Sequence, residues 1–197
     1  KPNIRPPVLW AIAAATVVAW LVGYLLYQDE VREIRAERSA ELAAIADLKV
    51  EQIEAWRRER LGDAEYVSTG PFNQALTERL LASPDDAELR GALAERAASL
   101  IRLYGYTAVI GGAPDRQAFV GAGDRPDTVT QPEKALISRA LQSRRVEFGQ
   151  ITVAEGGSGL DISRAAPVSD LAGDAIAAIV FRRDPQDDVL KIVERWP

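Results

Sequence analysis

Residues 160–182 read LDISRAAPVSDLAGDAIAAIVFR. Small and apolar residues fill segments 160–168 and 175–182, and the turn residues 171–174 separate them. Two such segments joined by a short turn predict an antiparallel pair of β-strands. Residues 145–153 have the same character and predict a third strand before this pair.

The segments upstream add two more strands and several helices. Residues 106–112 and 117–123 predict two strands around the turn Ala113-Pro114-Asp115. Adjacent strands with short turns, combined with helices, predict an α+β fold with an antiparallel sheet of about five strands. Helical periodicity, with Pro or Asp at helix starts, predicts helices over residues 71–82, 85 or 86 to 103, 131–143 and 184–196.

The N-terminal region predicts a transmembrane helix. Residues 8–27 (VLWAIAAATVVAWLVGYLLY) carry no charge, and a helix of this length spans about 30 Å, the thickness of a bilayer core. Trp10, Tyr24 and Tyr27 lie near its ends, where aromatic residues favour the membrane interface. A cleaved signal peptide is the alternative, but the segment is too long and no small-residue cleavage site follows.

The charges around this helix do not settle its orientation. Residues 1–7 contain Lys1 and Arg5, which favours a cytoplasmic N-terminal stub. Arg32, Arg35 and Arg38 follow on the other side, within the distance over which the charge bias acts. Because the chain begins at Lys1 rather than Met, we expect it to be part of a longer protein.

A long polar helix is predicted over residues 28–61, before a folded domain at residues 62–197. Apolar residues recur at helical spacing from Leu42 to Trp56, so the end near Trp56 is expected to pack on its own domain. The part before Leu42 has too few apolar residues for a buried face. It is expected to be a solvated stalk or a homodimer contact.

Composition narrows the function classes. The net charge of −5 argues against a nucleic-acid partner. The sequence contains no Cys, His or Met, which removes thiolate nucleophiles, the commonest general base and the commonest metal ligands. We expect no catalytic residues, no metal and no cofactor. Carboxylates are plentiful, but many lie at helix starts, where they interact with the helix dipole.

Two glycine clusters resemble phosphate-binding loops only superficially. The segment Glu155-Gly156-Gly157-Ser158-Gly159 lacks the Gly-Lys-Ser/Thr ending and leads into a strand rather than a helix. Gly121-Ala122-Gly123 has no third glycine in register. Both are interpreted as turns.

Several segments resemble the Cache (PDC) family of sensor domains, which implies a PAS-like antiparallel sheet. LKVEQIEAW at residues 48–56 resembles the family's first helix, and YGYTAV at residues 104–109 resembles the start of its sheet. Ala166-Pro167-Val168, Gly173 and residues 179–185 (IVFRRDP) resemble its last strand pair. Residues 192–197 (IVERWP) resemble a segment that leads into a second module in one subgroup, so this domain is expected to be the first of two.

The resemblance implies the extracytoplasmic sensor of a bacterial inner-membrane receptor, with a histidine kinase or GGDEF output and a homodimeric state. The chain itself is then a sensor and not an enzyme. The Tyr-x-x-x-x-Arg-x-Trp-Tyr pattern of the amino-acid-binding members is not visible in the sequence, so an amino acid is not predicted as the ligand. The alternative is a membrane-tethered structural module that binds a protein partner and no small molecule.

A fold of this kind packs one sheet face on the long helix and forms a small pocket on the other. Arg164 falls on the same face of its strand as Ile162 and Ala166, where a buried guanidinium needs an anion. A structural Arg164, paired within the domain or covering apolar surface, is the alternative. Asp161 and Ser163 lie on the opposite face and are candidates for lining the pocket. The candidate ligand-binding residues, for a small organic anion, are Arg164, Tyr104, Tyr106, Asp161, Ser163 and Arg182.

Overall fold

The computed structural model describes residues 6–154 and 159–194 of the chain. It divides into two compact units, Lys1–Glu51 and Gln52–Pro197. One long helix, α1 (Pro6–Thr69), contributes to both. Among the described residues, no helix offers a stretch long and apolar enough to cross a membrane. The long polar helix was predicted to end at residue 61. This predicted end is wrong, because α1 continues through Gly62 to Thr69.

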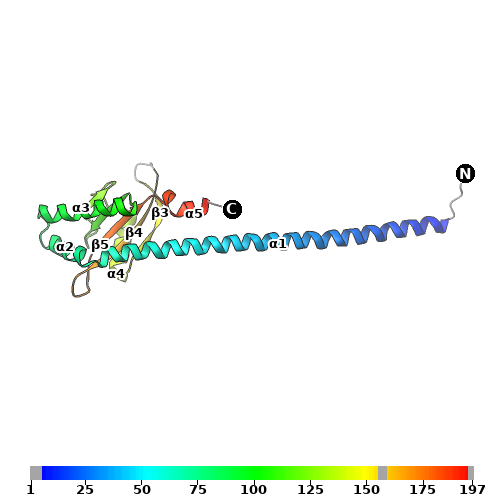
Figure 1. The fold of residues 1–197 in the computed structure, drawn as a ribbon, viewed down its shortest axis with the longest axis horizontal. Coiled ribbons are helices and arrows are strands. Elements are labelled where there is room, and N and C mark those ends of the chain that lie inside the picture. Colours follow the sequence, from blue (N-terminus) through cyan, green and yellow to red (C-terminus); the bar gives the residue numbers. More distant parts are fainter. Residues whose placement is uncertain (1–5, 155–158, 195–197) are drawn as a thin grey trace. The chain divides into compact units, whose positions relative to one another are not determined.

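The second unit is built on one antiparallel sheet (Figure 1). Its strand order is β2-β1-β5-β4-β3, so the last strand in the sequence pairs with the first and lies at the centre. The predicted α+β fold with about five strands is confirmed. The strands are β1 (Ala108–Gly112), β2 (Ala118–Gly123), β3 (Glu147–Val153), β4 (Leu160–Ser169) and β5 (Ala175–Arg183).

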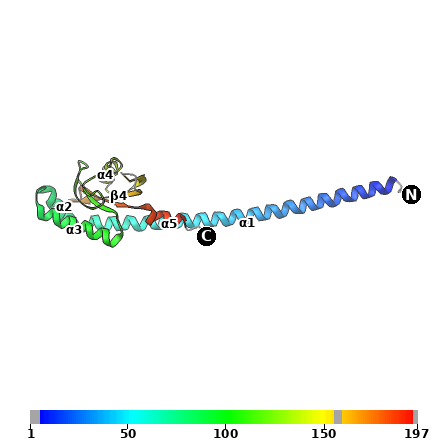
Figure 2. The ribbon, with the colours of Figure 1, turned by 90° about the horizontal axis from the view of Figure 1, so that it is seen from above.

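Helices cover both faces of this sheet, and Figure 2 shows α4 (Gln131–Ser143) on one side and α3 (Ala87–Tyr104) on the other. Ala64 and Val67 of α1 join Leu100 of α3 against Tyr106 and Phe181 in one core cluster. On the opposite face, side chains of α4 pack on alternate strand residues in a second cluster. Its members are Ala108, Ile110, Leu136, Ile137, Ala140, Ala165, Ala178 and Val180.

Local chemistry explains where the helices begin. Helix α2 (Pro71–Ala82) starts with Pro71 in its first turn. Asp86 caps α3 by accepting hydrogen bonds from the N–H groups of Glu88 and Leu89. Helix α4 begins with a capping box, in which Glu133 accepts from the Thr130 N–H at 2.9 Å.

The closing helix predicted over residues 184–196 is not continuous. A 3₁₀ turn, η1 (Pro185–Asp187), is followed by the short helix α5 (Val189–Glu194). Asp188 separates them, with backbone angles of φ −134° and ψ −101° that no helix accommodates. Its side chain is held by three residues elsewhere in the domain, described below. Trp196 lies outside the described residues.

Candidate functional site

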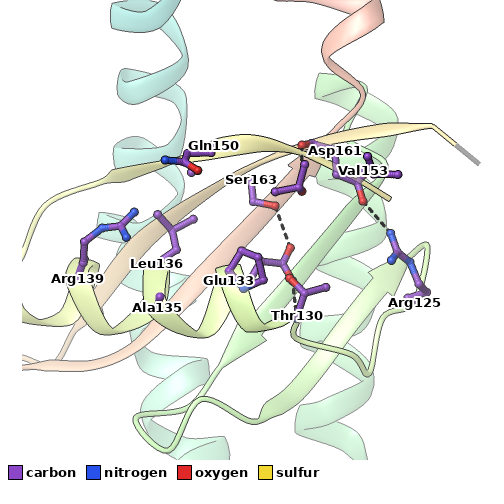
Figure 3. Close-up of a pocket in the computed structure, with 13 residues that line it drawn as sticks. Arg125, Thr130, Glu133, Ala135, Leu136, Arg139, Gln150, Val153, Asp161 and Ser163 are labelled. Carbon is purple, nitrogen blue, oxygen red and sulfur yellow. Dashed lines mark hydrogen bonds and ion pairs between the residues drawn. The ribbon is translucent and has the colours of Figure 1, made fainter. Parts of the chain in front are cut away.

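A cavity of about 340 Å³ lies on the α4 side of the sheet, between α4 and strands β3 and β4 (Figure 3). Its size falls at the lower end of the range for small-molecule sites. Figure 3 shows Arg139 and Arg125 at opposite ends of the labelled side chains, with Glu133 between them. The lining residues are Arg125, Thr130, Pro132, Glu133, Ala135, Leu136, Arg139, Gly149, Gln150, Thr152, Val153, Asp161 and Ser163.

Strand alternation brings two of the predicted residues into this cavity. Asp161 and Ser163 of β4 both point to the α4 side, whereas Arg164 points to the other face. The prediction that Asp161 and Ser163 lie opposite Arg164 is therefore confirmed. The pocket is on the face away from α1, as expected for a sheet that packs its other face on the long helix.

The lining residue Glu133 forms a buried ion pair with Arg182, and this pair is called the pocket floor below. Arg182 of β5 donates from Nε to Oε1 of Glu133 at 2.8 Å and from Nη2 to Oε2 at 2.7 Å. Arg182 also donates to the carbonyl oxygens of Asp124 and Thr128, and Ser163 donates to Glu133 Oε1 at 2.8 Å. The side chains of Arg182 and Glu133 are only 1% and 4% exposed. Such a network fixes both the helix start and the loop before it.

The charge of Glu133 is stabilised by these contacts. Burial alone would raise the pKa of its carboxyl group, because it disfavours the charged form. The hydrogen bonds from Arg182 and from the Thr130 N–H outweigh burial, so the pKa is held below its usual value. Glu133 is therefore an anion that Arg182 neutralises, and it is not available as a partner for a cationic ligand.

The two arginines of the rim differ in how firmly they are held. Arg125 donates to Asp161 Oδ2 at 2.8 Å, in a partly buried ion pair. Arg139 is exposed, lies 4.0 Å from a Glu147 oxygen and donates at 3.4 Å to the Phe148 carbonyl. Both contacts are at the outer limit of useful geometry. Arg139 is thus the rim cation that a ligand can engage without breaking a strong ion pair.

Close backbone packing places the loop that carries Arg125. A Cβ atom on Gly121 would lie 2.2 Å from the Pro126 carbonyl oxygen, so only glycine lets the loop lie against β2. Gly123 has φ +91°, which favours glycine as the chain leaves the strand. Arg125 itself has φ +51°. Gly121 and Gly123 lie within β2, so their interpretation as turn residues is wrong. The close approach of Pro126 to Gly121 positions the loop that brings Arg125 to the pocket. Residues 155–158 of the other predicted glycine turn lie outside the described residues.

Arg164 lies on the other face of the sheet, under the helices. It is 2% exposed, and its guanidinium carbon lies 5.3 Å from the Tyr106 ring centre and 5.5 Å from that of Phe148. Its Nε and Nη2 have no hydrogen-bond partner among the described residues. Burial lowers the pKa of Arg164, and the nearby Tyr106 and Asp188 only partly oppose this. Arg164 as an anion receptor stays a prediction, and the pocket described here does not include it.

The remaining candidates divide between the two faces. Tyr106 is buried against Phe181, and half-buried Tyr104 stacks on it with ring centres 5.9 Å apart. Burial raises the pKa of the Tyr106 hydroxyl, although Arg164 partly opposes this. Neither tyrosine lines the pocket, and Arg182 is connected to it through its ion pair with the lining residue Glu133. Tyr106 and Arg164 do contact each other, but not in this cavity.

The sequence did not reveal the pocket residues that come from α4 and from the loop after β2. Arg125, Glu133 and Arg139 were not among the candidates. One signal was present for Glu133, because Thr130-Gln131-Pro132-Glu133 has the spacing of a capping box and so places Glu133 at a helix start. Within the described residues, no group of three or more Asp, Glu, His or Cys side chains could hold a metal ion.

Comparison with known proteins rests on structure alone. No family model and no curated protein matches the sequence. The ligand-binding domain of the Campylobacter jejuni chemoreceptor Tlp3, solved with 4-methylisoleucine, is similar with a TM-score of 0.58 and 11% identity. The match covers 78% of this chain and 60% of that domain, so the chain spans less than two thirds of its length.

Two other sensor domains are similar at the same level. The domain of the Pseudomonas aeruginosa amino acid chemoreceptor PctC, in complex with GABA, is 19% identical with a TM-score of 0.51, over 77% of this chain and 66% of that one. The sensor domain of the V. cholerae histidine kinase DctB is 9% identical with a TM-score of 0.58, over 77% and 57%. The chain therefore has the fold of chemoreceptor and histidine-kinase sensor domains, as its resemblance to the Cache (PDC) family predicted.

Proposed function

We propose that this chain is the extracytoplasmic ligand-sensing domain of a transmembrane bacterial receptor of the sensor histidine kinase or diguanylate cyclase type. The observation that carries the proposal is the pocket of about 340 Å³ between α4 and strands β3 and β4, on a fold shared with sensor domains. Such a protein responds to a ligand only through the ligand's different affinity for two arrangements of the receptor.

The ligand we propose is a small molecule with a carboxylate group. The floor pair Glu133–Arg182 and the rim pair Arg125–Asp161 are each internally neutral. Arg139 adds a positive charge whose nearest carboxylate is at the limit of an ion pair. A carboxylate can accept two parallel hydrogen bonds from its guanidinium, which is the strong geometry for such a contact. Gln150 and Thr152 line the same cavity and supply further polar groups.

Ligand binding by thermal shift tests this directly, with the full chain in detergent. A panel of small mono- and dicarboxylic acids and amino acids, GABA included, is expected to contain at least one member that raises the melting temperature. A ligand at 100 times its Kd stabilises a protein by about 2.7 kcal/mol, which such an assay detects.

Arg139→Gln is expected to abolish the shift without lowering the melting temperature of the empty protein, since Arg139 is exposed. Arg102→Gln is the matched control, because Arg102 is an exposed arginine on α3 that contacts only the Ser99 hydroxyl among the described side chains. A shift that survives Arg139→Gln would refute the carboxylate contact. No shift with any member would favour a tethered module that binds a protein partner.

Membrane anchoring through residues 8–27 is the second part of the proposal. The charge-free sequence supports it, and large apolar side chains such as Trp20, Leu21 and Leu26 are exposed on this part of α1. Extraction of cell membranes with alkaline carbonate should leave the chain in the pellet and release a variant without residues 8–27. Release of both would contradict the anchor.

A further inference from the structure

The carboxylate of Asp188 contacts one hydrogen-bond donor and two cationic side chains from distant parts of the second unit. The Trp56 indole N–H donates to Oδ1 at 2.5 Å. Oδ2 lies 3.1 Å from Arg183 Nε and 3.7 Å from Arg60 Nε. The side chain is 8% exposed. Trp56 and Arg60 belong to α1, whereas Arg183 ends β5 and Asp188 itself follows the last strand. One buried carboxylate thus joins α1 to the segment by which the chain leaves the sheet.

The partners of Asp188 are themselves held by neighbouring elements. Arg60 also donates to Asp63 Oδ2 at 2.8 Å, one turn further along α1. Arg183 donates from Nη1 to the Tyr104 carbonyl at 2.7 Å, at the end of α3. Trp56 packs on Phe148 of β3, with ring centres 5.8 Å apart. If the Asp188 contacts open, the buried carboxylate and the two guanidinium groups must be hydrated, so intermediate arrangements are disfavoured.

Strands β4 and β5 also carry Ser163 and Arg182, which contact Glu133 on the α4 face of the sheet. Ser163 and Arg182 are partners in the β4–β5 register, and both hydrogen-bond to Glu133. The next residue of each strand points to the opposite face. Arg164 then lies over Phe148, and Arg183 lies at Asp188. A shift of β5 that follows Glu133 therefore also moves Arg183 at Asp188. A shift of β4 moves Arg164, which contacts Phe148, the ring on which Trp56 packs.

We propose that Asp188 is a latch that sets how firmly residues 52–69 of α1 are held on the sheet, and that the state of the pocket floor biases this latch. The second half rests on the proposed sensing function, because it makes the pocket the input. The latch and its partners Trp56, Arg60 and Arg183 constitute the two-state element that a sensor requires.

Hydrogen exchange on the full chain tests the latch without any ligand. In Asp188→Ala, amides of residues 52–69 are expected to exchange at least about tenfold faster than in the unchanged protein, because this segment opens more often. Asp188→Asn keeps an acceptor for Trp56 and should give a smaller increase. Asp187→Ala is the matched control, since Asp187 is exposed and pairs only with Lys191 among the described residues.

Protection of β4 and β5 amides serves as the check that each variant is folded. Equal exchange of residues 52–69 in Asp188→Ala and Asp187→Ala, with the strands protected in both, would overturn the latch. If Asp188→Ala fails to fold, the comparison of Asp188→Asn with Asp187→Asn decides the question in the same way.

The link to the pocket floor is tested by combining Glu133→Gln with Asp188→Asn. If the two sites are coupled, the change in exchange rate in the double variant should differ by about fivefold or more from the product of the two single-variant changes. Multiplicative rates would refute the link. This outcome is independent of the thermal-shift test, because a ligand can bind the pocket without moving the latch, and the latch can exist in a domain that binds no acid.

Discussion

Arg182 and Arg164 are both buried on the two central neighbouring strands, yet they are held in opposite ways. Arg182, facing α4, donates to both oxygens of Glu133 and to two backbone carbonyls. Arg164, on the other face, lies between the rings of Tyr106 and Phe148 with two N–H groups unpaired among the described residues. Burial alone therefore does not show which arginine is needed for stability. The hydrogen-bond and ion-pair partners of each arginine do show it.

The comparison predicts the largest effect for Arg182→Met. This change leaves the Glu133 carboxylate buried without its cation and frees the carbonyls of Asp124 and Thr128. Breaking a buried pair by removing one partner costs about 3–5 kcal/mol. Urea denaturation of the full chain, followed by far-UV circular dichroism, measures it. A loss below about 1 kcal/mol would show that the pair is replaceable.

A smaller, pH-dependent effect is expected from Glu133. Its pKa in the folded protein lies below the ordinary value of 4.5, so the folded state binds fewer protons than the unfolded state as the carboxyl titrates. The stabilisation is complete above pH 4.5 and is lost as the pH falls through the folded pKa. Glu133→Gln removes this contribution. The difference in unfolding free energy between the two proteins should thus stay constant from about pH 7 to about pH 5.5 and narrow as the pH falls below 4.5. A difference that stays constant in this acid range would contradict the assignment.

The smallest effect is expected for Arg164→Met. An apolar side chain of similar length removes a buried charge with unpaired donors, and it also removes the two ring contacts, worth about 0.5–2 kcal/mol each. The gain from removing the unpaired charge and the loss of the ring contacts nearly cancel. We therefore expect the free energy of unfolding to change by no more than about 1 kcal/mol. Arg164→Ala should destabilise more, since it leaves a cavity. If Arg164→Met destabilises the protein as much as Arg182→Met does, the contrast between the two arginines is wrong.

Much of the fold could be predicted because its signals are local. The alternation of apolar residues in 160–168 and 175–182 indicated the central strands and correctly separated Ser163 from Arg164. The end of α1 was misplaced, because Gly62 is tolerated within a helix whose later residues Ala64 and Val67 pack in the core. Tertiary packing outweighed the local preference of one glycine.

The pocket was only partly predictable, since its residues come from elements that meet only in the folded chain. Ser163 and Asp161 followed from strand alternation, and Arg182 was named without its partner. Arg125 and Arg139 carry no local pattern that distinguishes them from other surface arginines. Their role depends on a loop packed against Gly121 and on a helix placed by the capping box of Glu133.

The Glu133 side chain has three roles at once. It caps α4, accepts a hydrogen bond from Ser163 and is the counter-ion of Arg182. A change there must be matched at several positions together, so Glu133 and Arg182 should vary jointly or not at all among descendants of this sequence. Arg139 and Gln150 hold no such network among the described residues. Natural variation can therefore retune ligand preference at the rim one substitution at a time, while the floor preserves the fold that makes each intermediate viable.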